Sequence, residues 1–520
     1  MHDKIVILDF GSQYAQLIAR RVREMQVFCE LVPWNATAEA LRDPSVKGYI
    51  LSGGPNSVYG EEAPKIPEIV LQSGLPILGI CYGMQALAHQ LGGEVSPEAR
   101  REYGLAEVAV KAANPLLEQR DWTVWMSHGD RVTRMPPSWH ALATSENCPI
   151  AAMADPSKHR YALQFHPEVK HTRKGSEILR NFVLAICEAQ ASWTAQSIIE
   201  QSIAAIRAQV GEGIVLSAVS GGVDSSVATA LARRAVGDQV KGFFIDTGLL
   251  RLNEREQVEK AFAPLFGEGF KVIDARARFI GNLEGETDPE TKRKIVGETF
   301  IREFEAAARQ FGNVDFLCQG TIYPDVVESQ GIGAKQAQRI KSHHNVGGLP
   351  SDMQFKLVEP LRWLFKDEVR AVGEALGLPH ELVWRQPFPG PGLAVRVVGE
   401  VTQERVLTLQ KADDIFTSEL AKAGLLQMVE DEAGKVSGSS QAFAALLPVR
   451  SVGVMGDQRT YAETIALRAV TTTDFMTADW ARLPYELMAK VSNRIVNEVP
   501  GVNRVVYDIS SKPPATIEWE

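Results

Sequence analysis

The amino-acid sequence predicts an α/β protein with two doubly wound parallel-sheet domains, followed by a smaller α+β domain. The chain has 520 residues, and at roughly 100–200 residues per domain this length corresponds to about three domains. Short apolar runs alternate with helical patterns in two separate stretches, as in parallel sheets covered by helices. A cluster rich in Pro and Gly at residues 386–393 then interrupts the pattern. We expect domains at residues 1–192, 193–394 and 395–520.

The first stretch alternates short apolar runs with segments of helical spacing. We expect strands at Ile5–Leu8, Gly48–Leu51 and Ile77–Ile80, and helices at Tyr14–Met25 and Gly175–Glu188. The carboxyl ends of these parallel strands should meet at one edge of a sheet.

A second series of the same kind begins near residue 213. Its expected strands are Gly213–Val219, Val240–Ile245, Lys271–Ile273 and Asp315–Cys318, with a helix at Val227–Arg233. The last domain should contain strands at Val395–Val398, Val449–Val454, Ala466–Val470 and Arg504–Ile509.

The overall composition excludes several functional classes. Hydrophobic residues make up 45% and charged residues 23%, as in ordinary globular proteins. The net charge of −9 argues against a nucleic-acid partner, which requires basic patches. There is no apolar run long enough for a membrane span and no signal-peptide pattern at the start. Five scattered cysteines without a CxxC pair disfavour a disulfide framework or a zinc site, so we expect a cytoplasmic enzyme with reduced thiols.

Cys81 stands between an expected strand and an expected helix. Gly79 and Gly83 flank it in a G-x-C-x-G pattern, the thiol counterpart of a nucleophile elbow. The helix N-terminus would favour a thiolate at this point. A small buried cysteine without chemistry is the alternative for a single Cys.

A histidine and a glutamate supply partners for such a nucleophile. Pro167 should keep the backbone extended, so His166 and Glu168 would point to the same side, where the carboxylate could orient the imidazole. Taken alone, His-Pro could be a surface turn. The backbone amides of Gly53 and Gly54, after an expected strand, could form an oxyanion hole or only a turn.

These three motifs, in this order, resemble the class I glutamine amidotransferases over residues 1–190. The resemblance implies a flavodoxin-like domain in which Cys81 attacks the glutamine side-chain amide to form a thioester, with His166 as base and acid and Glu168 orienting it. It also implies an oxyanion and glutamine site at Gly53, Gly54, Tyr82, Gln85, Ser127, His128, Gly129 and Asp130. The product would be ammonia.

Residues 220–226 combine two glycines and three serines at an expected helix N-terminus, where N–H groups and hydroxyls can bind phosphate. The segment lacks the G-K-[ST] ending of a Walker loop, and a plain turn is the alternative. It resembles the S-G-G-x-D-S loop of the ATP pyrophosphatases, which implies a Rossmann-like domain. The ATP-binding residues implied are Ser220, Gly221, Gly222, Val223, Asp224, Ser225, Ser226, Asp246 and Lys341.

Mg²⁺ accompanying ATP would require oxygen ligands, for which Asp224 and Asp325 are the candidates. Lys341 belongs to a glycine-rich stretch, residues 331–348, which we interpret as a mobile lid. The adjacent His343 and His344 invite a metal interpretation, but no further ligands stand at suitable spacing.

Over essentially the whole chain, the sequence resembles the glutamine-hydrolysing GMP synthases. The segments that carry this resemblance are Lys341–Gly348, Gln386–Leu393, Val452–Asp457 and Lys512–Glu520. It implies that ATP, XMP, glutamine and water give GMP, AMP, pyrophosphate and glutamate, through an adenylate on the xanthine C2 oxygen. The implied XMP-binding residues are Asp457, Arg468, Lys512, Ile517 and Glu518. The family's third domain mediates dimerisation, so a homodimer is expected.

Three alternatives compete with this interpretation. An NAD synthetase would pair the phosphate loop with a nitrilase-type glutaminase and lack the His-Pro-Glu segment. A tRNA-modifying enzyme would show a basic stripe, which the charge of −9 disfavours. A scaffold role would leave two catalytic constellations unexplained.

Overall fold

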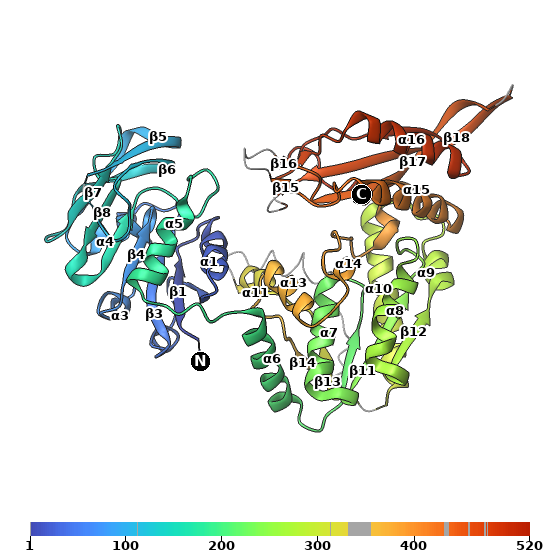
Figure 1. The fold of residues 1–520 in the computed structure, drawn as a ribbon, viewed down its shortest axis with the longest axis horizontal. Coiled ribbons are helices and arrows are strands. Elements are labelled where there is room, and N and C mark those ends of the chain that lie inside the picture. The colour runs from blue at the N-terminus through green and yellow to red at the C-terminus, as the bar shows by residue number, and fades with distance from the viewer. Residues whose placement is uncertain are drawn as a thin grey trace. The chain divides into compact units, whose positions relative to one another are not determined.

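The computed structural model describes residues 2–111, 113–312, 314–330, 355–430, 436–455, 458–472, 475 and 477–520. The chain forms two compact units, one of residues 1–198 and 324–334 and the other of residues 199–323 and 335–520 (Figure 1). The first unit ends close to the boundary expected at residue 192. The three expected domain ranges stay predictions, because grouping by contacts does not say which part folds independently.

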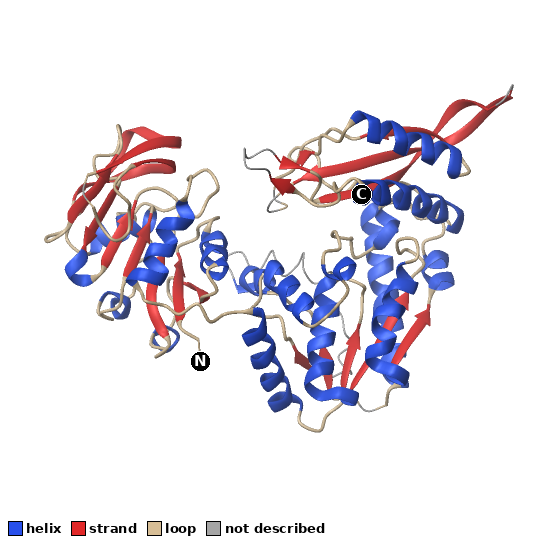
Figure 2. Ribbon diagram, viewed as in Figure 1, coloured by secondary structure: helices blue, strands red, loops and turns tan. Residues whose placement is uncertain are grey.

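The first unit contains a nine-stranded mixed sheet (Figure 2). Its parallel half has the order β2 (Phe28–Pro33), β1 (Lys4–Asp9), β3 (Val46–Leu51), β4 (Ile77–Ile80) and β9 (Arg160–Leu163). The sheet continues with antiparallel strands β8 (Ala152–Asp155), β7 (His140–Thr144), β5 (Glu94–Val110) and β6 (Asp121–Arg134). The three expected strands are confirmed, whereas the antiparallel extension is not among the sequence predictions.

The helices of this unit follow the apolar spacing of the sequence. They are α1 (Ala15–Glu24), α2 (Ala38–Leu41), α3 (Glu68–Leu71), α4 (Tyr82–Gln90) and α5 (Gly175–Arg180), which continues as a π-helical turn at Asn181–Ile186; α6 (Ala195–Val210) crosses into the second unit. In α1 the residues Ile18 and Val22, four apart, are buried on one face, as an amphipathic helix requires. Both helices expected here are confirmed.

The second unit contains a five-stranded, wholly parallel sheet. Its order is β12 (Phe270–Asp274), β11 (Val240–Asp246), β10 (Val215–Ala218), β13 (Phe316–Cys318) and β14 (Lys356–Val358). The accompanying helices are α7 (Val223–Val236), α8 (Glu254–Phe266), α9 (Arg276–Asn282), α10 (Pro289–Gln310), α13 (Lys366–Ala375) and α14 (His380–Val383). The four strands and the helix expected here are confirmed. Most of α11 (Tyr323–Gln330) is grouped with the first unit.

The C-terminal part is an antiparallel hairpin with helices packed on it. It consists of α15 (Gln403–Lys422), β15 (Val429–Glu430), β16 (Val436–Ser437), β17 (Gln441–Met455), β18 (Gln458–Thr471), β19 (Asp479–Trp480), α16 (Tyr485–Glu498) and β20 (Val502–Tyr507). Strand β20 pairs with β18 in the parallel sense. The described helices include none that is both long and apolar enough to cross a membrane.

One expected strand, Val395–Val398, is wrong. Residues Gly392–Val395 form a 3-10 turn, and Val397 makes only an isolated bridge to Leu446. Val395 and Val397 are fully buried, and Val397 belongs to the hydrophobic core that the parallel sheet shares with the hairpin, whereas Val398 is only partly buried. A short buried turn and a short buried strand have the same apolar pattern.

Candidate active sites

Cys81 occupies a strained turn between β4 and α4. Its φ of +52° lies in the left-handed region, which is uncommon for a residue with a side chain. A Cβ on Gly83 would lie 2.4 Å from the Leu51 carbonyl oxygen, and one on Gly79 would lie 2.7 Å from the Gly83 carbonyl group. The glycines are therefore required by close backbone approach, and the tight turn places Cys81 at the N-terminus of α4.

His166 and Glu168 form a buried hydrogen-bonded pair beyond the end of β9. Nδ1 of His166 lies 2.7 Å from Oε1 of Glu168, and their side chains are 4% and 0% exposed. The predicted pairing is present, but residues 167–168 form a turn instead of extended backbone. Proline fixes its own φ and suits a turn as well as a strand, so it could not decide between them.

The turn at Cys81, the ring of His166 and Gly53 lie close together. A Cβ on Gly53 would lie 3.1 Å from Cε1 of His166 and 3.8 Å from Cβ of Cys81. Burial by itself lowers the pKa of His166. The Glu168 carboxylate and the Cys81 side chain outweigh it, and together they raise this pKa well above its usual value. The site therefore favours the charged imidazolium form of His166 next to the Cys81 side chain.

Two functional neighbours of this site escaped the sequence analysis. Thr172 donates to the carbonyl oxygen of His166 at 2.5 Å and accepts from the amide of Trp125, so it fixes the backbone of the histidine. Gln164 is fully buried, and its amide nitrogen lies 3.8 Å from Sγ of Cys81. The spacing of Gln164, two residues before His166, could have indicated it; no sequence signal marks Thr172.

The expected glutamine-binding residues separate into two groups. Gln85 donates to the carbonyl oxygen of Asp130 at 2.8 Å, and the Ser127 carbonyl lies 3.7 Å from Sγ of Cys81, so this segment of β6 borders the nucleophile. Gly129 belongs to the same strand. Tyr82 lies elsewhere: its hydroxyl donates to the Pro64 carbonyl inside the core, and burial raises its pKa to about 12.

Gly54 and His128, also expected in the glutamine site, make close contacts inside the protein. A Cβ on Gly54 would lie 2.7 Å from the Phe10 carbonyl oxygen, so only glycine fits there. His128 is buried, with Nδ1 3.1 Å from the Asp130 carbonyl and Nε2 3.3 Å from Glu102.

The predicted phosphate loop follows β10 and leads into α7. Gly221 adopts a φ of +76°, and the amide of Ser220 donates to the Ser225 hydroxyl at 3.2 Å. The Ser226 hydroxyl donates to the carbonyl oxygen of Gly222, which caps α7 just before Val223. The loop therefore presents its amides at a helix N-terminus.

Asp224 lies in the first turn of α7. Lys366 donates to its Oδ2 at 2.5 Å, while its buried Oδ1 has no hydrogen-bond partner among the described residues. Arg385 supports the loop from outside by donating to the Gly221 carbonyl at 3.0 Å and pairing with Glu254 at 2.6 Å. The sequence analysis predicted none of these three supporting residues, Lys366, Arg385 and Glu254.

The other residues predicted to bind ATP, Mg²⁺ or XMP do not form one cluster among the described residues. Asp246 ends β11, where its carboxylate accepts from the amide of Gly248 at 3.0 Å and from Arg255 at 3.3 Å. Asp325 lies in the first turn of α11, in residues grouped with the first unit, so its pairing with Asp224 stays a prediction. Lys341 and Asp457 lie outside the described residues.

The C-terminal segment is fixed to the hairpin by two buried arginines. Arg468 is fully buried and donates to the carbonyl oxygens of Ser510 at 2.6 Å and Thr516 at 3.1 Å. Arg396, also fully buried and not predicted, forms two hydrogen bonds of 3.0 and 2.9 Å with the Glu518 carboxylate. In this arrangement Arg468 acts on the tail's backbone and does not point to solvent.

The other two tail candidates lie beside this anchor. Ile517 packs against Phe443 and Val470. Lys512 is half-buried and donates to the Phe475 carbonyl oxygen at 2.8 Å.

The fold and the elbow site of the first unit define a class I glutamine amidotransferase. A family model described as glutamine amidotransferase class-I matches residues 6–186, and one described as GMP synthase C terminal domain matches residues 429–519.

Three relatives described as GMP synthase (glutamine-hydrolyzing) align over nearly their whole length. The one from Thermomicrobium roseum is 59% identical over 100% of this chain and 97% of its own. Those from Clostridium botulinum strain Kyoto and Heliobacterium modesticaldum are each 54% identical, over 99% and 100% of this chain and 99% of their own. The chain belongs to the family of glutamine-hydrolyzing GMP synthases.

Proposed function

We propose that the chain makes GMP by aminating XMP with ammonia released from glutamine. The observation that carries this proposal is the buried constellation of Cys81, His166 and Glu168 on an amidotransferase fold, in a chain aligned from end to end with GMP synthases. ATP and water are consumed, and AMP, pyrophosphate and glutamate are the other products.

In the first half-reaction, the thiolate of Cys81 attacks the glutamine carboxamide carbon. His166 gives its proton to the departing ammonia, and a glutamyl thioester remains; water then attacks the thioester with His166 as base, and glutamate leaves. Glu168 keeps the imidazole oriented and favours its charged form. The backbone amides of Gly53 and Gly54 would stabilise the oxyanion; a Cβ on Gly53 would lie 3.8 Å from Cβ of Cys81, which supports this role for the segment.

In the second half-reaction, the XMP C2 oxygen attacks the α-phosphorus of ATP and pyrophosphate leaves. Ammonia then attacks C2 and AMP departs. The amides and hydroxyls at residues 220–226 would hold the phosphates, and Lys341 would add a positive charge.

Asp224 is suited to hold Mg²⁺ with ATP, because its Oδ1 is buried without a hydrogen-bond partner among the described residues. When bound, Mg²⁺ neutralises phosphate charge. Asp246, at the carboxyl end of β11, lies at the sheet edge where nucleotides bind in open α/β sheets.

For XMP, we propose that Lys512 and Asp457 contact the nucleotide directly. Ile517 and Glu518 would line the pocket, and the buried Arg468 would hold the tail in the shape that forms it. The anchoring of this tail by Arg396 and Arg468 supports a site whose position is set before XMP arrives.

We propose that the enzyme is a cytoplasmic homodimer without a nucleic-acid partner. Several large apolar side chains are exposed on the β17–β18 hairpin, among them Val449, Val452, Tyr461 and Val454, which is 75% exposed. A second copy would cover this surface. None of the five cysteines, all of which the structure describes, forms a disulfide, as a reducing compartment would require.

The test compares GMP formation from glutamine with GMP formation from ammonium salt, in the presence of XMP, ATP and magnesium. Cys81→Ala should abolish the glutamine-driven reaction and retain the ammonia-driven one. Cys187→Ala, another buried cysteine of the same unit, is the matched control. Asp224→Ala should abolish AMP release with either nitrogen source. The proposal fails if Cys81→Ala loses both reactions while remaining folded, or if AMP release survives Asp224→Ala.

A further inference from the structure

Three chemically different side chains that are far apart in the sequence meet inside the antiparallel part of the first sheet. Glu102 on β5 and His128 on β6 are direct cross-strand partners, and Cys148 comes from the turn between β7 and β8. Their carboxylate oxygen, imidazole nitrogen and sulfur atoms all lie within 4.8 Å of one another. The side chains of His128 and Glu102 are only 2% and 11% exposed, and Cys148 is fully buried.

The hydrogen bonds of His128 leave a mismatch that a cation would resolve. Nδ1 lies 3.1 Å from the Asp130 carbonyl oxygen, which can only accept, so Nδ1 carries the proton. In the neutral ring Nε2 then offers a lone pair, yet it faces Oε2 of Glu102 at 3.3 Å, which is also an acceptor.

We propose that Glu102, His128 and Cys148 bind one Zn²⁺ ion, through a carboxylate oxygen, Nε2 and Sγ. Tetrahedral zinc with bonds of about 2.0–2.3 Å separates its donor atoms by roughly 3.3–3.6 Å, so the observed 3.3 Å between Nε2 and Oε2 already fits two ligands. The Nδ1–H bond to a carbonyl is the outer contact that histidine ligands of metals commonly make. Water completes the coordination.

Zinc binding requires the Cys148 thiol to lose its proton. The Cys148 thiol now donates to the Ile150 carbonyl oxygen at 3.3 Å, and it must release this proton to solvent as the zinc–sulfur bond forms. No oxidant or reductant is involved.

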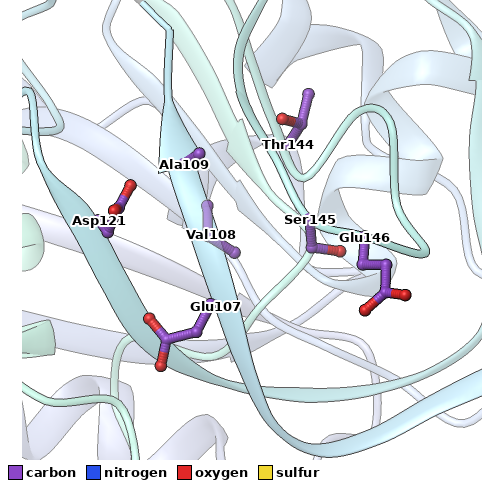
Figure 3. Close-up of a pocket in the computed structure, with 7 residues that line it drawn as sticks. All are labelled: Glu107, Val108, Ala109, Asp121, Thr144, Ser145 and Glu146. Carbon is purple, nitrogen blue, oxygen red and sulfur yellow. The ribbon is translucent and has the colours of Figure 1, made fainter.

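An acidic surface pocket shares one wall residue, Ser145, with the surroundings of Glu102. Figure 3 shows the carboxylates Glu107, Asp121 and Glu146, all exposed, among the residues that line this pocket, whose volume is about 360 Å³. Its wall also includes Ser145, whose hydroxyl lies 3.1 Å from Oε1 of Glu102. Clustered carboxylates raise the local concentration of cations.

The zinc would brace the strand segment beside the nucleophile. His128 immediately follows Ser127, whose carbonyl lies 3.7 Å from Sγ of Cys81. Bound zinc would therefore fix this part of β6 against β5 and the β7–β8 turn. This inference does not depend on the proposed synthetic reaction.

The test uses the full-length chain carrying Cys81→Ala, because Cys81, His166 and Glu168 could themselves bind a soft metal. The metal-free protein is titrated with Co²⁺, which reports thiolate ligation by a charge-transfer band in the near ultraviolet. We expect one Co²⁺ per chain with this band, and its displacement by Zn²⁺. Cys148→Ser in the same background should remove the band, and Cys187→Ser should leave it unchanged.

If Cys148→Ser does not fold, Glu102→Gln decides, because it keeps the side chain's size. It should weaken Co²⁺ binding by at least about tenfold. The absence of a charge-transfer band, a band that survives Cys148→Ser, or unchanged affinity in Glu102→Gln would each overturn the site.

Discussion

The replacement Glu168→Gln tests how strongly one carboxylate controls the amidotransferase centre. The carboxylate lies 2.7 Å from Nδ1 of His166, and neither side chain is more than 4% exposed. Its second oxygen, Oε2, has no hydrogen-bond partner among the described residues, so its interaction with His166 is the main stabilisation of its charge. A glutamine keeps the shape and removes this charge.

The expected magnitude follows from these contacts. A buried hydrogen bond to a charged group contributes about 1.5–3 kcal/mol, and 1.36 kcal/mol is tenfold in rate, so its loss slows glutamine hydrolysis by about 10–150-fold. If the amide turns its NH₂ group toward Nδ1, the imidazole takes the wrong tautomer, and losses up to about 10⁴-fold follow. We expect a decrease of about 10–10⁴-fold, depending on which way the amide turns.

The pH dependence should change in a defined direction. Glu168 and Cys81 raise the pKa of His166 against the effect of burial, so the stability this pair contributes is complete below the usual histidine pKa and is lost as pH rises through the raised one. In Glu168→Gln the pKa of His166 falls. The alkaline decline of glutamine hydrolysis should therefore move to lower pH.

The assay measures glutamate release and ammonia-driven GMP formation on the same preparation, with Glu177→Gln as the control. Glu177 is an acid of α5 that pairs with Arg120 at the surface. A Glu168→Gln enzyme that hydrolyses glutamine at the normal rate, or that loses ammonia-driven synthesis in parallel, would refute the role of this carboxylate.

Two further predictions concern backbone approach and the anchored tail. Gly83→Ala places a Cβ 2.4 Å from the Leu51 carbonyl, so the backbone must shift by about 1 Å; we expect roughly 10²-fold slower glutamine hydrolysis, with ammonia-driven synthesis retained. Gly297→Ala, where a Cβ meets no atom within 4 Å, is its control, and equal rates in both variants would contradict the steric argument. Lys292 is fully buried and donates to Glu520 at 2.6 Å. Lys292→Met should lower the free energy of unfolding by about 3–5 kcal/mol, because it leaves the Glu520 carboxylate without its partner, and should expose the C-terminal amides to hydrogen exchange. The exposed Lys294→Met is the control there, and unchanged exchange near Glu520 would rule out the anchor.

Local patterns determined the parallel sheets and the turns at their carboxyl edges. The glycines around Cys81 and the loop at residues 220–226 could be identified in advance, because a tight turn after a buried strand needs particular residues at fixed spacing. The strand expected at Val395–Val398 is wrong because a local pattern of buried valines does not distinguish a buried turn from a buried strand.

Positions brought together from distant segments could not be identified in this way. Thr172, Arg385 and Arg396 each act on backbone or charge far along the chain, and the contact exists only after folding. A tyrosine beside the nucleophile looked like part of the site, yet the direction of its side chain into the core was decided by the packing of α4.

The sequence by itself determined the glycine-flanked turn at Cys81, the closely spaced His166 and Glu168, and the Gly- and Ser-rich loop at residues 220–226, because each is specified by residues close together along the chain. Only the tertiary structure decided that Arg468 supports the tail from within, and that Glu102, His128 and Cys148 share one buried space. Such contacts depend on strand register and on how turns cross the sheet, and both are set by the packing of the whole unit.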